Sequence, residues 1–231
     1  MGDDSVTITS WRRGVLALVA GLAATGSLVL AFAVSTRPGH TRATTLASAF
    51  QALVPTPAPA GWSRLPLPNE TAVLSYPPTL RRVISDSDAV SAALPGPGGA
   101  YLLYLSATPR QGGENLQNWA AYRLRVLTSE DASSAREDAA ATELAFLGGT
   151  GSCVIDDYIT RIGAHHFEEL ACLVQGRAGA SVIVAAAPAA RWAQSRPLLE
   201  RAVAAYSVRL SGRVSRTSPT GRCRHAGRSA G

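Results

Sequence analysis

The fold of this chain is decided by its most strongly patterned stretch, residues 153–188, which read CVIDDYITRIGAHHFEELACLVQGRAGASVIVAAAP. β-Branched, aromatic and other apolar residues fill three runs, and small turn residues at positions 163–164 and 176–179 separate them. A shorter run at residues 143–147 comes before them and leads into GGTG. The pattern predicts consecutive strands of an antiparallel meander.

The turn between the first two of these strands sets their register. Opposed residues of a regular hairpin have residue numbers with a constant sum. If Ile162 and Gly163 form the tip of the turn, this sum is 325, and Cys153 therefore lies opposite Cys172. Directly opposed residues in a non-hydrogen-bonded pair have Cα atoms about 4.5 Å apart, near the lower limit for a disulfide. We therefore predict a Cys153–Cys172 disulfide, and the alternative is two buried free thiols.

Further strands and a helix are predicted before the meander. The strands are expected at residues 72–76, 82–85, 89–94 and 100–107. An apolar stripe at helical spacing then predicts a core-facing helix, with Arg123 and Arg125 facing outward; it consists of Leu116, Trp119, Ala120, Leu124 and Leu127. Residues 128–142 are polar, and their pattern allows either a loop or a solvated helix.

A closing helix is predicted after Pro188, where Trp192, Leu199 and Val203 share an apolar face. Pro197 either kinks this helix or begins a second helical piece. Trp119 and Trp192 are expected in the core. The predicted fold class is α+β: an N-terminal transmembrane helix followed by one domain, in which an antiparallel sheet packs against helices.

An uncharged apolar run, GVLALVAGLAATGSLVLAFAV at residues 14–34, follows the N-terminal tail at residues 1–13. As a helix it is long enough to cross about 30 Å of hydrocarbon, which predicts a single-pass anchor. A cleavable signal peptide is the alternative, because Ala31 and Ala33 form an A-x-A-like site. Both interpretations place the domain on the extracytoplasmic side of the cell membrane.

The remaining layout follows from composition. Residues 35–60 are rich in Thr and Pro and are expected to form a stalk, residues 61–210 the folded domain, and residues 211–231 a disordered basic tail with Cys223 unpaired. The net charge of +6 arises at the two ends, since residues 60–211 hold 13 Arg and 14 acidic residues. The domain therefore lacks the basic face of a nucleic-acid binder. All 22 basic residues are Arg, which we interpret as a GC-rich, actinobacterial source.

A possible metal site is suggested by His165, His166, Glu168 and Glu169. Alternate residues of a strand face opposite ways, so His166 and Glu168 share one face while His165 and Glu169 share the other. No spacing brings three ligands together. We therefore expect a solvated strand start and neither a metal nor a cofactor.

Possible catalytic groups are also divided. Asp156 and Asp157 diverge in a strand, so we expect them on a polar outer face or in a salt bridge to Arg161. Cys153 and Ser152 begin a strand, whereas a nucleophile elbow needs a strand-to-helix turn. No catalytic residues are predicted.

The order of these elements resembles a known fold. The order consists of a strand, a Pro-Pro turn, further strands, a helix with Trp119, the segments GGTGSCVIDDYITR, ELACLVQG and VIVAAAP, and a closing helix with Trp192. It is similar to that of the PsbP-like α/β/α sandwich. That family includes photosystem extrinsic proteins and mycobacterial LpqN-type envelope lipoproteins. The resemblance covers about residues 61–208 and implies the fold, without a catalytic residue set. Unlike the lipoproteins, this chain has no lipidated cysteine.

The predicted function is that of a membrane-anchored extracytoplasmic domain, non-enzymatic, which binds an envelope protein, a lipid or a glycan or assists an envelope complex. The alternative is an exported enzyme such as a hydrolase, which would need titratable groups gathered in one cleft around Asp156, Tyr158, Arg161 or His166. A third possibility is a cytoplasmic domain whose basic tail contacts nucleic acid or anionic lipid.

Overall fold

A computed structural model of the chain describes residues 49–209. The predicted tail at residues 1–13, the predicted membrane segment at residues 14–34 and the basic residues 211–231 lie outside the described residues. Within residues 49–209 no helix combines the length and the hydropathy that crossing a bilayer requires.

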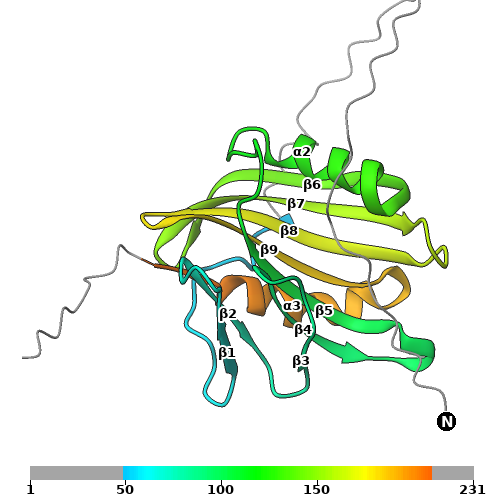
Figure 1. Ribbon diagram of the computed structural model, residues 1–231, viewed down its shortest axis with the longest axis horizontal. Coiled ribbons are helices and arrows are strands. Elements are labelled where there is room, and N and C mark those ends of the chain that lie inside the picture. The colour runs from blue at the N-terminus through cyan, green and yellow to red at the C-terminus, as the bar shows by residue number, and fades with distance from the viewer. Residues whose placement is uncertain (1–48, 210–231) are drawn as a thin grey trace, which may run out of the picture.

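Residues 49–209 form two antiparallel sheets and two α-helices, so the α+β class with an antiparallel sheet is confirmed (Figure 1). The larger sheet has seven strands in the order β3 (Arg81–Val83), β4 (Val90–Pro95), β5 (Tyr101–Pro109), β9 (Gly179–Pro188), β8 (His166–Gly176), β7 (Gly149–Thr160) and β6 (Ala132–Phe146). The smaller sheet has the order β1 (Ser63–Pro66), β2 (Ala72–Tyr76) and β10 (Ser207–Val208). The helices are α2 (Trp119–Val126) and α3 (Trp192–Ala204), and short helical turns lie at Pro97–Gly99, Leu127–Asp131 and Ala189–Arg191.

The two helices cover opposite faces of the larger sheet (Figure 1). Alternate residues of the central strands face α3 and the smaller sheet and form the main core, to which α3 contributes Leu199, Ala202 and Val203. The residues between them face α2 and form a smaller apolar cluster of Trp119, Val154, Ala171 and Leu173. Phe50 and Leu53, which belong to the predicted stalk, are buried in the main core, so packing begins before residue 61.

The register predicted for β7 and β8 is confirmed along the whole ladder, from Gly149 opposite Gly176 to Ile159 opposite His166. Cys153 and Cys172 face each other with Cα atoms 4.1 Å apart and form the predicted disulfide. Two turn residues in the sequence were therefore enough to align these strands.

The predicted loop or solvated helix at residues 128–142 is wrong. The chain makes one short helical turn at Leu127–Asp131 and then enters the long strand β6. Among the described strands β6 pairs with β7 alone, at the edge of the sheet, and three register shifts interrupt the pairing. An edge strand with bulges can carry a polar sequence because most of its side chains meet water, so the apolar alternation that marks a central strand is lost.

Candidate functional site

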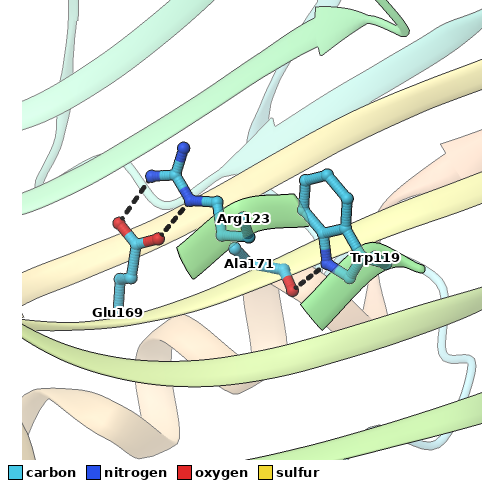
Figure 2. Close-up of polar contacts among 4 residues, drawn as sticks. All are labelled: Trp119, Arg123, Glu169 and Ala171. Atoms are coloured by element: carbon cyan, nitrogen blue, oxygen red, sulfur yellow. Dashed lines mark hydrogen bonds and ion pairs between the residues drawn. The ribbon is translucent and has the colours of Figure 1, made fainter. Parts of the chain in front are cut away.

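The site begins with Arg123 of α2, which points into the sheet and not outward as predicted. Its Nε and Nη2 donate to the two carboxylate oxygens of Glu169 on β8, at 2.6 and 2.9 Å (Figure 2). Arg123 is 8% exposed and Glu169 is 0% exposed, so this bidentate ion pair is buried. Burial lowers the pKa of Arg123, but the charge and hydrogen bonds of Glu169, together with Tyr158 and Asp156, raise it overall, and the guanidinium stays charged.

A second contact fixes the same helix to the same strand. One turn before Arg123, the indole Nε1 of Trp119 donates to the backbone oxygen of Ala171 at 2.9 Å (Figure 2). The Trp119 ring packs against Val154 and Leu173. α2 has only eight residues, so it needs tertiary contacts such as these and a small apolar cluster to hold it on the sheet.

Asp156 of β7 completes the site. It lies directly opposite Glu169, is 0% exposed, and neither of its carboxyl oxygens has a hydrogen-bond partner among the described residues. Burial, followed by the negative charge of Glu169, raises the pKa of Asp156 to about 8, although Arg123 acts in the opposite direction. At neutral pH the Asp156 carboxyl is therefore mainly protonated.

Aromatic rings border these buried groups. Tyr158, two residues after Asp156 on the same face of β7, stacks on Phe167 of β8 with ring centroids 6.0 Å apart. Both rings are half-buried. Burial and then the charge of Glu169 raise the pKa of the Tyr158 hydroxyl, so Tyr158 remains neutral and can donate a proton to a hydrogen bond.

The opposite face carries a separate surface pair. His166 Nε2 lies 2.6 Å from Asp157 Oδ2, and the His166 side chain is about half exposed. Glu168 lies nearby, and burial, Asp138 and Asp157 raise its pKa. Within residues 49–209 no three His, Cys, Asp or Glu side chains are placed to share a metal ion.

The structure therefore separates the residues that the sequence analysis considered together. Asp156 and Tyr158 lie on the α2 face, whereas His166 pairs with Asp157 on the α3 face. Arg161, in the β7–β8 turn, donates to the backbone oxygens of Thr128 and Ser129.

Two predictions about these residues are wrong. Asp156 is neither on a polar outer face nor paired with Arg161, and Glu169 is not solvated. Both are buried beneath α2, from which Arg123, 33 residues before Asp156 and 46 before Glu169, binds Glu169. The sequence did contain a signal, because the register that pairs Cys153 with Cys172 also places Asp156 opposite Glu169.

The remaining candidates hold the fold together. Ser152 donates its hydroxyl to the backbone oxygen of Leu116, and Cys153 is oxidised, so neither is a free nucleophile. Trp119 and Trp192 are 3% and 6% exposed, which confirms that both belong to the core.

One shallow pocket of about 230 Å³ lies between residues 52–56 and α3, where Pro197, Glu200 and Arg201 line it. It is not situated between the sheet and its helices. Arg196 Nε bonds to Glu200 at 2.6 Å, so the nearest acidic group is already paired.

No family model and no curated protein matches this chain. Similar solved structures include cyanobacterial PsbP (CyanoP) from Synechocystis sp. PCC 6803, at 15% identity over 66% of this chain and 95% of that one, with a TM-score of 0.47. A protein of unknown function from Pseudomonas aeruginosa, PA94, matches at 12% identity over 66% and 100% of the two chains, with a TM-score of 0.43. LpqN of Mycobacterium tuberculosis matches at 13% identity over 66% and 80%, with a TM-score of 0.32. These matches agree with the predicted PsbP-like arrangement at the level of fold only.

Proposed function

We propose that this chain is an extracytoplasmic domain, tethered to the cell membrane by residues 14–34, that acts as a non-enzymatic binding or accessory component of the cell envelope. Its partner would be an envelope protein, a lipid or a glycan. The observation that carries the proposal is that the titratable and nucleophilic groups of the core are buried and closed to a substrate.

The disulfide supports the location. Structural disulfides persist in exported proteins and are rare in the cytosol, where thiols are kept reduced. Cys153 and Cys172 are 1% and 0% exposed and join two central strands, so their bond belongs to the core of the domain.

The buried polar groups support the non-enzymatic part. A catalytic acid, base or nucleophile has to reach its substrate. Glu169 is bound at both oxygens by Arg123, and Asp156 has no exposed surface. The accessible pair, Asp157 and His166, lies on the other face of the sheet and has no neighbouring nucleophile among the contacts of the described residues.

Protease and alkylation treatment of intact cells tests the location. Added protease should remove the domain from intact cells, and a membrane-impermeant thiol reagent should fail to label Cys153 and Cys172 until a reductant and a denaturant are added. A Cys153→Ser variant, which frees Cys172, provides the matched control. Protection of the domain in intact cells together with its degradation in lysed cells would contradict the tether and its orientation.

Photo-crosslinking tests the binding role. Ile84 and Ile162 are 101% and 87% exposed and accept a photoreactive amino acid without disturbing the core. A binding domain should give a discrete adduct from one of these places, unchanged when Asp157→Asn and His166→Gln are introduced. A hydrolytic activity of the full chain that is lost on neutralising Asp157 and His166, with the adduct intact, would instead favour the exported hydrolase.

A further inference from the structure

We propose that α2 is a proton-controlled cover: it stays on the sheet while the buried carboxyl of Asp156 is protonated, and it loosens when that carboxyl ionises. The arrangement contains one guanidinium and two carboxyls. Arg123 reaches across from α2 to Glu169, and Asp156 lies beside Glu169 on the neighbouring strand. This inference does not depend on the proposed binding role.

The charge balance explains the coupling. With Asp156 neutral, Arg123 and Glu169 form a balanced buried pair. Once Asp156 ionises, two negative charges face one positive charge in a site without exposed carboxylate surface, and such an excess charge is strongly unfavourable. Moving α2 away admits water to Asp156 and relieves this imbalance.

The acidic groups around Asp156 act in the same sense. From β8 it faces Glu169, and from β6 it is influenced by Glu137 and Asp138, all of which disfavour a further negative charge. From α2 it faces Arg123, the opposing influence. Burial and these acids together place the pKa of Asp156 at about 8 with α2 in position.

Movement of α2 has a defined consequence for the surface. The helix covers Val154, Ala171 and Leu173, which are at most 1% exposed. Its release would uncover this apolar strip on the sheet, while α3 and the main core on the other face would be unaffected.

The direction of the pH dependence follows from linkage. With α2 open, Asp156 titrates near the ordinary aspartate value of about 4. Opening therefore becomes about ten-fold more favourable per pH unit between that value and pH 8, and levels off above it. The closed form is favoured in acid.

Hydrogen–deuterium exchange on the full chain, in detergent and between pH 5 and 9, tests the cover. After correction for the intrinsic pH dependence of exchange, peptides spanning Trp119–Val126 should open about ten-fold more per pH unit up to pH 8, and peptides from Trp192–Ala204 should not. Asp156→Asn should abolish the rise. Asp157→Asn, the adjacent carboxyl on the other face, should retain it.

Two outcomes would overturn the proposal: a rise in Asp156→Asn equal to that of the unaltered chain, or a parallel rise in α2 and α3, which is the signature of global loosening. If a variant fails to fold, a measurement on the unaltered chain still tests the proposal. The ¹³C resonance of the Asp156 carboxyl should titrate where α2 opening levels off. Titration near pH 4 with α2 protection constant across the range would also refute the cover.

Discussion

Glu169 of β8 lies directly opposite Asp156 of β7, and neither side chain has any exposed surface. Two carboxyls so close in the core cannot both be charged without a large free-energy penalty. The structure separates their roles: Glu169 accepts two hydrogen bonds from Arg123, while Asp156 has no hydrogen-bond partner in the described residues and a pKa raised to about 8, so it is mainly neutral at pH 7.

Replacing Asp156 by Asn should change the pH dependence of stability. A carboxyl whose pKa is raised on folding contributes stability below its unfolded pKa, and this is lost as pH rises toward 8. The free energy of unfolding of Asp156→Asn, relative to the unaltered chain, should therefore rise by roughly 1.4 kcal/mol per pH unit between about pH 4 and 8. Urea titrations at several pH values measure it. A difference in free energy between the variant and the unaltered chain that stays constant across this pH range would contradict the assignment.

Removing one partner of the buried ion pair should be far more damaging than removing both. Arg123→Met leaves Glu169 charged and unpaired in the core, which should lower the free energy of unfolding by about 3–5 kcal/mol. In the double variant Arg123→Met/Glu169→Met no charge remains in the pair, so its loss should be smaller than that of Arg123→Met alone. A double-mutant cycle from urea unfolding checks this, and simple additivity of the two changes would show that the pair is not coupled.

The glycines of the GGTG segment should be intolerant of a side chain for a steric reason. Gly148 has φ +89°, and a Cβ there would clash with the backbone oxygen of Val208, because β10 passes against this turn. Gly148→Ala should destabilise the domain by roughly 1–3 kcal/mol. Gly113→Ala is the matched control, since a Cβ at Gly113 meets nothing within 4 Å. Thermal melts of both variants measure the effect, and equal melting temperatures would argue against close packing of β10.

The disulfide should stabilise the domain while remaining closed to reagents. Its two cysteines are 19 residues apart in sequence, so the chain-entropy model gives a contribution of about 3 kcal/mol. The variant Cys153→Ala/Cys172→Ala should lose about that amount in urea unfolding. In a Cys223→Ala background, a thiol reagent should label the chain only when reductant and denaturant have been added together. Labelling of the native protein without reductant would mean that the bond does not form.

Much of the fold was predictable because it follows from local pattern. Placing Ile162 and Gly163 at the tip of the turn aligned β7 with β8, and the same alignment predicted the Cys153–Cys172 disulfide. A strand has a side-chain period of two, so one turn determines every pair along the hairpin. The strand predicted at residues 72–76 is also observed with those limits, as β2.

β6 could not be predicted from local pattern. Its sequence is polar, and small residues occur in it more often than β-branched ones, so propensity does not favour a strand. Pairing along one side with β7 overrides that preference, with bulges that absorb the mismatch. Edge position is a property of the assembled sheet, which a window of sequence does not contain.

By itself, the sequence determined the α+β class, the register of the central hairpin and the covalent bond across it, since each depends on alternation and on turn positions close together in the chain. Only the tertiary structure decided that Asp156 and Glu169 are buried and that Arg123 points inward. Burial depends on which element packs over a strand, and here that element is α2, whose arginine lies 46 residues before the glutamate that it binds.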